Sequence, residues 1–136
     1  MSSYGLELIS SEQCLELLRT QHVGRVGVCS GRAGVFPVLY ALLDDDVVFR
    51  TAPGEKLIAA AMHREVVFEI DSFNMATRSG WSVNVLGTAE EIQDPDELTR
   101  ASALGLVPWA GEVRDRYVRI RASELSGRRI KATDAD

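Results

Sequence analysis

Cysteine and histidine are scarce in this chain, with 2 of each among its 136 residues. Two cysteines are too few for a framework of disulfides, and neither has a close metal-ligand spacing to a histidine. We therefore predict no metal site. No local signature of a Ser-His-Asp or Cys-His nucleophile is present either, so covalent hydrolysis is not predicted.

Long hydrophobic runs are also missing. The longest covers residues 35–43 and is broken by Pro37, whereas a membrane-spanning helix needs about 20 apolar residues. Residues 1–11 lack both the basic stretch and the apolar core of a secretory signal. We therefore expect no membrane partner and a cytoplasmic location.

Positive charge is in deficit, because 15 lysines and arginines stand against 20 acidic residues, for a net charge of -5. Nucleic-acid binding depends on clustered positive charge. The nearest cluster, Arg114, Arg116, Arg119 and Arg121, is interrupted by Asp115, and we interpret it as a solvated strand face. The sequence predicts no nucleic-acid partner.

The remaining composition, 46% hydrophobic and 26% charged, is typical of a globular protein. A length of 136 residues suits one domain, since two halves would each be too small to bury a good core. We predict a single domain over residues 1–136, with residues 131–136 as a flexible tail.

Alternating apolar residues and turn signals predict mainly strands. The expected strands are 23–29, 35–43, 47–51, 66–71, 81–89, 116–122 and a short seventh over 128–131. Three short helices are expected, over 11–21 after a Ser10–Gln13 capping box, over 57–62, and from the Asp94 cap to Gly105. Because the strands follow one another as hairpins, we predict an antiparallel six- to seven-stranded β-barrel, mainly β with short helices (α+β).

The segment Val47-Val-Phe-Arg-Thr-Ala-Pro-Gly-Glu-Lys-Leu is the first candidate binding site. A strand ends at Arg50 and Thr51, and a helix begins near Lys56, where free amides favour an anion. Arg50 offers a fork of donors, Thr51 a hydroxyl and Lys56 a mobile charge, which together would hold a terminal phosphate. From the residues alone, a plain strand-turn-helix with two solvated cations is equally well supported.

The two tryptophans mark the other candidates. In Ser79-Gly-Trp-Ser, Trp81 offers a flat apolar surface and Ser82 a short donor on the opposite face, which a flat heteroaromatic ligand needs. The alternative interpretation is that Trp81 fills the barrel core. Trp109 lies in an expected loop, where it belongs either to an interface or to the core.

Six segments in sequence order carry a resemblance to a known family. They are Val23-Gly-Arg-Val-Gly-Val, Phe36-Pro-Val-Leu-Tyr-Ala, Val48-Phe-Arg-Thr-Ala-Pro-Gly-Glu-Lys-Leu, Val67-Phe-Glu-Ile-Asp, Gly80-Trp-Ser-Val-Asn-Val-Leu-Gly and Pro108-Trp-Ala. Together they resemble the pyridoxamine 5′-phosphate oxidase-like flavin-binding proteins, most closely the short split-barrel branch. The resemblance spans residues 8–130.

This resemblance implies an FMN-binding split β-barrel homodimer, with one FMN in each of two clefts between protomers. It also implies which residues contact the cofactor: Arg50, Thr51 and Lys56 the phosphate, Pro37, Val38 and Leu39 the isoalloxazine ring, Trp81 and Ser82 the ring or its side chain, and Trp109 from the other subunit. A barrel of this size fills its own interior with side chains, so a large flat cofactor must lie outside it.

Two departures from the family narrow the function. Relatives often have Asn where this chain has Leu39, and the C-terminal Arg-x-His substrate element of the true oxidases is missing. We therefore do not predict oxidation of vitamin B6. The sequence predicts an FMN-binding protein, and specifically an FMN-dependent oxidoreductase of unknown substrate, in which the flavin carries out the redox chemistry and the protein positions it.

Three alternatives stay open. The first is a deazaflavin-dependent reductase, since related split barrels bind that longer and more acidic cofactor. The second is a haem-binding relative, for which only His22 and His63 could serve as axial ligands. The third is a non-catalytic flavin-binding or sensor protein, or a scaffold dimer.

Overall fold

The computed structural model describes residues 6–29, 31, 33–52, 56–107 and 116–132, without the side chain of Lys56. The elements in this part of the chain are, in order, β1 (Leu6–Ile9), α1 (Ser11–Leu18), β2 (Val23–Val28), β3 (Gly34–Leu43), β4 (Asp46–Thr51), α2 (Lys56–Ala61), β5 (Glu65–Asn74), β6 (Ser79–Glu91), α3 (Pro95–Ser102) and β7 (Arg116–Ile130). Strands therefore dominate, and the helices are short.

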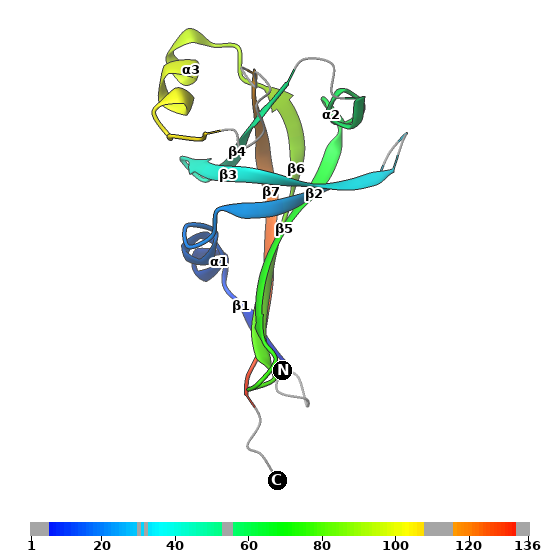
Figure 1. Ribbon diagram of the computed structural model, residues 1–136, viewed down its shortest axis with the longest axis vertical. Helices are drawn as coiled ribbons and strands as arrows, with labels where there is room; N and C mark the ends of the chain where they lie inside the picture. The colour runs from blue at the N-terminus through cyan, green and yellow to red at the C-terminus, as the bar shows by residue number, and fades with distance from the viewer. Residues whose placement is uncertain (1–5, 30, 32, 53–55, 108–115, 133–136) are drawn as a thin grey trace.

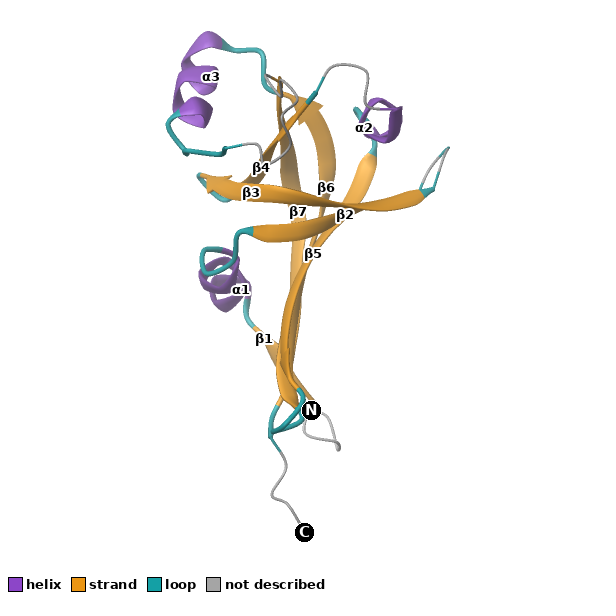
Figure 2. Ribbon diagram, viewed as in Figure 1, coloured by secondary structure: helices purple, strands orange, loops and turns teal. Residues whose placement is uncertain are grey.

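The strands form one antiparallel sheet that closes on itself (Figure 2). The strand order is β1-β7-β4-β3-β2-β5-β6, and a further pairing of β6 with β7 closes six of these strands into a barrel. β1 lies outside this closure and pairs with the end of β7. The predicted fold class, an antiparallel split β-barrel with short helices, is confirmed.

The molecule has a broad upper part and a narrow lower part (Figure 1). The upper part holds β3, β4, α2 and α3, while β1 and the ends of β5, β6 and β7 run down into the lower part. Helix α1 packs beside the lower part, where it contacts β6 and β7. This leaves one side of the lower sheet covered by a helix.

Four strands, β1, β5, β6 and β7, differ from the prediction. β7 is one strand over Arg116–Ile130, so the predicted sixth and seventh strands are two parts of the same strand. A register shift between Leu86 and Gly87 of β6, which lie opposite Glu124 and Ala122, accommodates the extra residue in β7. β1 was not predicted at all, and β5 and β6 both extend further toward the turn that joins them.

The barrel interior is filled by the apolar residues that alternate along its strands. The largest fully buried side chains include Phe49 and Phe68. Gly24 of β2 is required where the Phe68 ring crosses that strand, because a Cβ built on Gly24 would lie 2.2 Å from Cζ of Phe68. The described residues inside the barrel thus form a packed core of side chains, which is expected for a barrel of this size.

A second, smaller core lies between α3 and the outside of the barrel. It contains Val48, Ala101 and Tyr117. Arg119 lies beside it with its side chain 4% exposed, paired with Glu97 of α3 and with Asp46 at 3.4 Å. The prediction of a solvated strand face is therefore wrong at Arg119, because a helix distant in the sequence covers this position.

Candidate functional site

The strands carry the predicted site residues on two different faces of the sheet. Register pairs place one set of alternating residues inside the barrel and the other set on its outer wall. We call the second surface the outer face. On β2, β3, β5, β6 and β7 it carries Val23, Arg25, Val35, Pro37, Leu39, Val67, Glu69, Asp71, Phe73, Ser82, Asn84, Leu86, Ser126, Arg128 and Ile130.

Arg50 and Thr51 leave β4 on opposite faces. Thr51 shares the interior side with Phe49 and is 3% exposed. Arg50 shares the outer face with Val48, and by the same alternation with Leu39 of the neighbouring strand. The two residues predicted to hold one phosphate therefore do not point to a common space.

The guanidinium of Arg50 has a defined position. Its Nη1 donates a hydrogen bond to the carbonyl oxygen of Leu106 at 2.7 Å. Its Cζ lies 5.2 Å from the centroid of the Tyr117 ring, within the range of a cation–π contact. These contacts hold the cation beside the chain segment that follows α3.

The other predicted phosphate residue, Lys56, begins α2. Its side chain and residues 53–55 lie outside the described part of the structure, as does Trp109. Convergence of Lys56 with Arg50, and the contribution of Trp109 from a second subunit, stay predictions.

The residues predicted to border a ring are also divided between the faces. Pro37 and Leu39 of β3 lie on the outer face, opposite Arg25 and Val23 of β2. Val38 points inward and packs against the barrel core. The outer face therefore presents Pro37 and Leu39 as an apolar border on one side.

Trp81 and Ser82 of β6 separate in the same way. Trp81 is half-buried and packs against the barrel core, as the alternative interpretation of this residue predicted. Ser82 lies on the outer face, between Asp71 of β5 and Arg128 of β7. Ser82 is thus available to a ligand on the outer face, and Trp81 supports the strand from behind.

An open pocket of about 530 Å³ lies at the turn between β5 and β6. It is lined by Ser72, Phe73, Asn74, Met75, Ser79, Gly80 and Trp81. Gly80 lets the Phe73 ring lie flat across β6, because a Cβ on Gly80 would be 2.2 Å from Cδ1 of Phe73. Two aromatic residues and three small polar residues therefore border this pocket.

A second pocket, of about 470 Å³, lies between the end of α1, β3 and the segment after α3. Its lining includes Arg19, His22, Tyr40 and Leu106. The hydroxyl of Tyr40 donates to the carbonyl oxygen of Leu18 at 2.5 Å, and burial of Tyr40 raises its pKa well above the ordinary value. Because Leu106 also holds Arg50, this pocket adjoins the predicted phosphate residue.

A charged cluster that the sequence pattern did not predict lies in the middle of the outer face. Nη1 of Arg25 lies 3.4 Å from Oε1 of Glu69 and 3.8 Å from Oδ2 of Asp71. Burial raises the pKa of Glu69 to about 7, and the neighbouring Asp71 acts in the same direction while Arg25 opposes it. Alternation of Glu69 and Asp71 along β5 was the one signal in the sequence, and Arg25 lies 44 positions earlier in the chain.

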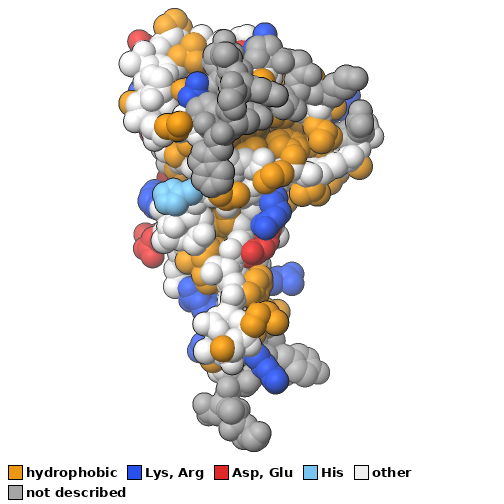
Figure 3. Space-filling model, in the orientation of Figure 1, with side chains coloured by type: hydrophobic (Ala, Val, Ile, Leu, Met, Phe, Trp, Pro, Cys, Tyr) orange, Lys and Arg blue, Asp and Glu red, His pale blue; other side chains and the backbone are white. Residues whose placement is uncertain are grey.

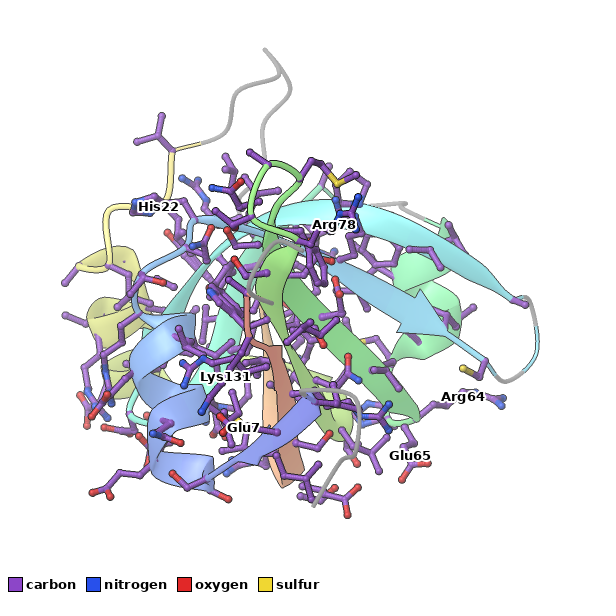
Figure 4. The ribbon with its side chains drawn as sticks, turned by 90° about the horizontal axis from the view of Figure 1, so that it is seen from below. Glu7, His22, Arg64, Glu65, Arg78 and Lys131 are labelled. Atoms are coloured by element: carbon purple, nitrogen blue, oxygen red, sulfur yellow. The ribbon has the colours of Figure 1, made fainter. Side chains whose placement is uncertain are left out.

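The other charged residues near the site are largely paired. Arg121 contacts Glu90, and Arg116 lies 3.9 Å from Glu91. At the lower end, Lys131 and Glu7 point toward one another in Figure 4, with Nζ and Oε1 2.7 Å apart. Arg116, Arg119 and Arg121 of β7 thus face acidic partners, which weakens the attraction of this part of β7 for a polyanion.

Metal ligands do not gather in the part of the chain that the structure describes, where no group of three His, Cys, Asp or Glu side chains could hold an ion. His22 and His63 belong to separate segments, after α1 and after α2. Among the described residues, no helix has the length and apolar character needed to span a membrane.

The sequence matches one protein family and several proteins of known sequence. The model of the pyridoxamine 5′-phosphate oxidase family matches residues 10–129. An uncharacterised protein of Mycobacterium tuberculosis is 30% identical over 130 residues, which cover 91% of this chain and 85% of that protein.

Solved structures agree with this placement. An FAD-binding protein of Mycobacterium smegmatis is 31% identical with a TM-score of 0.80, and the match covers 92% of this chain and 100% of that one. A conserved protein of unknown function from Corynebacterium diphtheriae is 32% identical with a TM-score of 0.78, covering 93% and 98% of the two chains.

Proposed function

The chain belongs to the pyridoxamine 5′-phosphate oxidase family, and from this premise we propose that it binds a flavin, FMN, on the outer face of its barrel. The observation that carries the proposal is the common face of Pro37, Leu39, Arg50 and Ser82. These residues supply an apolar border, a cation and a hydroxyl donor on one wall. A flat ring with a phosphorylated tail needs this combination.

The roles of these residues follow from their chemistry. Arg50, fixed by its hydrogen bond to Leu106, would pair with the phosphate, and Lys56 at the start of α2 would add a second cation. Backbone groups near Pro37 and Leu39 would border the ring, and Ser82 would donate to it. Thr51 keeps its predicted role only if a ligand draws its hydroxyl out of the barrel interior.

We propose further that a second copy of the chain completes the groove. The outer face leaves several apolar side chains in water, among them Val35 at 69% and Phe73 at 54% exposure. Figure 3 shows hydrophobic side chains on this side of the molecule, over β2 and β3 and again in the narrow lower part. A partner subunit would cover them and contribute Trp109.

An FMN-dependent oxidoreductase of a small substrate is the activity that we propose for this site. Bound flavin would supply hydride and electron transfer. The chain's own part would be to hold the phosphate, orient the ring against β3 and β6, and exclude water between the two copies.

FAD is the second candidate cofactor, because the relative from Mycobacterium smegmatis is an FAD-binding protein. FAD shares the ring and the first phosphate with FMN and adds an adenylate. Such a tail would continue from the phosphate at Arg50 toward the pocket of about 470 Å³ that Leu106 also lines. A deazaflavin would use the same cation and would need further basic residues along its longer tail.

The visible absorption spectrum of the purified protein tests the proposal, together with the mass of any released cofactor. We expect a flavin spectrum, a released mass equal to that of FMN, and restoration of the spectrum when FMN is added to stripped protein. Release of FAD or a deazaflavin would replace FMN within the same site. A protein that stays colourless after each of the three cofactors is added would contradict flavin binding and would favour the scaffold dimer.

A further inference from the structure

Two carboxylates and one guanidinium meet on the outer face. They lie between Pro37 and Ser82, two of the residues proposed to contact the flavin. Arg25 of β2 stands opposite Pro37 on one side and Glu69 on the other. Asp71, two residues along β5, stands opposite Ser82. The same Nη1 atom of Arg25 faces both carboxylates, at 3.4 Å and 3.8 Å, so their oxygens are close to one another as well.

The neighbouring strands bring few other charges to this cluster. The outer-face residues of β6 beside it, Ser82 and Asn84, are uncharged, and Pro37 occupies the position on β3. On β7, the described residue Arg128 lies beyond Ser82. One guanidinium therefore faces two acids at short range, which leaves one negative charge in excess when both acids are ionised.

The cluster is already partly withdrawn from water. Side-chain exposure is 30% for Glu69 and 32% for Asp71. Burial is the largest cause of the raised pKa of Glu69, about 7, and the hydrogen bond and charge of Asp71 add to it. Glu69 thus exchanges a proton near neutral pH, and further loss of water would favour its neutral form.

Several apolar side chains of the outer face around the cluster are exposed in the described part of the chain. Val23 and Val35 lie on either side of Arg25 along the β2–β3 pair, and Phe73, Ile130 and Leu8 lie toward the β5–β6 turn. In the lower part, α1 packs against the other side of the sheet. A second copy is the occupant that fits this face, because its own outer face is equally apolar and also carries one guanidinium among two acids.

We propose that two copies of this chain pair through the outer face and that each copy takes up a proton at the Arg25–Glu69–Asp71 cluster as they do so. This inference rests on the proposed function, since that function places the flavin in the groove between the copies. Pairing removes water from Glu69 and Asp71, and an added proton removes the excess negative charge that would otherwise be buried. The proton is held between the two carboxyl groups, and it comes from solvent.

The coupling sets the direction of the pH dependence. Because the pair of copies holds more protons than two separate copies, the dimer becomes tighter as the pH falls through the neutral range. One proton per copy changes the dissociation constant by up to about a hundredfold per pH unit, since each proton contributes about tenfold.

Sedimentation equilibrium of the full chain from about pH 6 to about pH 8 tests this, with flavin content read by absorbance on the same samples. We expect the wild-type dissociation constant to rise with pH. Glu69→Gln, which imitates the protonated acid, should stay tightly paired and lose the pH dependence. Glu16→Gln, on the exposed surface of α1, is the matched control and should behave as the wild type.

Asp71→Asn provides an independent variant should Glu69→Gln fail to fold. Removing the neighbouring charge lowers the pKa of Glu69, so the pH dependence should move to lower pH. A wild-type dissociation constant that is unchanged or falls with rising pH would overturn the proposal, as would a monomer at every pH. A flavin-loaded dimer without pH dependence refutes only the proton coupling, whereas a pH-dependent dimer that takes no flavin refutes only the proposed function.

Discussion

Arg50 and Thr51 are adjacent in the chain, and their side chains lie on opposite faces of β4. Arg50 donates to the carbonyl of Leu106 outside the barrel, while Thr51 is 3% exposed inside it. A strand reverses its side-chain direction at every residue, so only one of the two can face a ligand on the outer wall. Of the two residues proposed to contact the phosphate, only Arg50 therefore lies on the outer face.

Arg50→Ala combined with Lys56→Ala should weaken FMN binding by at least about a hundredfold. Each charge-assisted contact to phosphate contributes about 1.5 to 3 kcal/mol, and about 1.4 kcal/mol corresponds to a factor of ten. Fluorescence titration with FMN measures the change. Arg64→Ala combined with Lys131→Ala removes the same charge from exposed positions and should leave the affinity close to wild type. Equal affinity for both double variants would remove the phosphate site from β4 and α2.

Thr51→Val should leave FMN affinity within about threefold of wild type, which is less than about 0.7 kcal/mol. The two side chains have similar shapes, and the Thr51 hydroxyl makes one long hydrogen bond, 3.4 Å, to the carbonyl of Ala52. The same titration measures this variant. A loss of tenfold or more would mean that the hydroxyl turns outward to the ligand, as the family resemblance implies.

Glu97→Ala should destabilise the fold by about 2 kcal/mol, because it leaves the buried Arg119 with Asp46 as its acidic partner among the described residues. Urea denaturation measures the free energy of unfolding. Glu90→Ala removes the partner of the exposed Arg121 and serves as the control, with an expected loss below about 1 kcal/mol. Adding Arg119→Met to Glu97→Ala should recover part of the loss, since the buried cation is removed while Asp46, whose side chain is 22% exposed, keeps its hydrogen bond from the Ala122 N–H. If the two single variants lose equal free energy of unfolding, then Arg119 is hydrated well enough that it does not need Glu97 as a partner.

The pattern of the sequence was sufficient for the barrel and for most strand positions. It failed at β7, where the polar stretch Ala122 to Glu124 looks like a break between strands. Pairing with β6 and a single register shift carry the strand through that stretch. β1 has four residues, and its place is set by its pairing with β7, which the local sequence does not encode.

The candidate site, too, could be predicted only in part from the sequence. Alternation along β3, β4 and β6 was already visible in the sequence, and it determines which of the predicted residues reach the outer face. The Arg25–Glu69–Asp71 cluster depends on the register between β2 and β5. Register is set by tertiary packing and turn geometry, so adjacent positions on one strand did not reveal the partner on the next.

Glu69→Gln should also change how folding stability depends on pH. In the folded chain burial raises the pKa of Glu69 from its ordinary 4.5 to about 7. Between these values the folded state binds more protons than the unfolded state, so the free energy of unfolding falls as the pH rises through this window. The variant does not titrate and should lack this fall.

Urea denaturation of monomeric samples across the window measures the difference between wild type and Glu69→Gln. The difference should be small near pH 4.5 and should grow in favour of the variant toward pH 7. Because the side chain is about 30% exposed, we expect a final difference of about 1 kcal/mol. A difference that does not vary with pH would mean that Glu69 titrates normally.

Gly24→Ala should destabilise the barrel by about 2 kcal/mol, because the new Cβ would lie 2.2 Å from Cζ of Phe68, whose ring is fully buried. Gly27→Ala is a control on the same strand, where the nearest atom to a new Cβ is the Val67 carbonyl oxygen at an ordinary 3.7 Å. Urea denaturation of the two variants should show a clear loss for Gly24→Ala and a change within about 0.5 kcal/mol for Gly27→Ala. If both variants lose the same free energy of unfolding, the loss comes from replacing any glycine in β2. A clash with the Phe68 ring would then not explain the effect of Gly24→Ala.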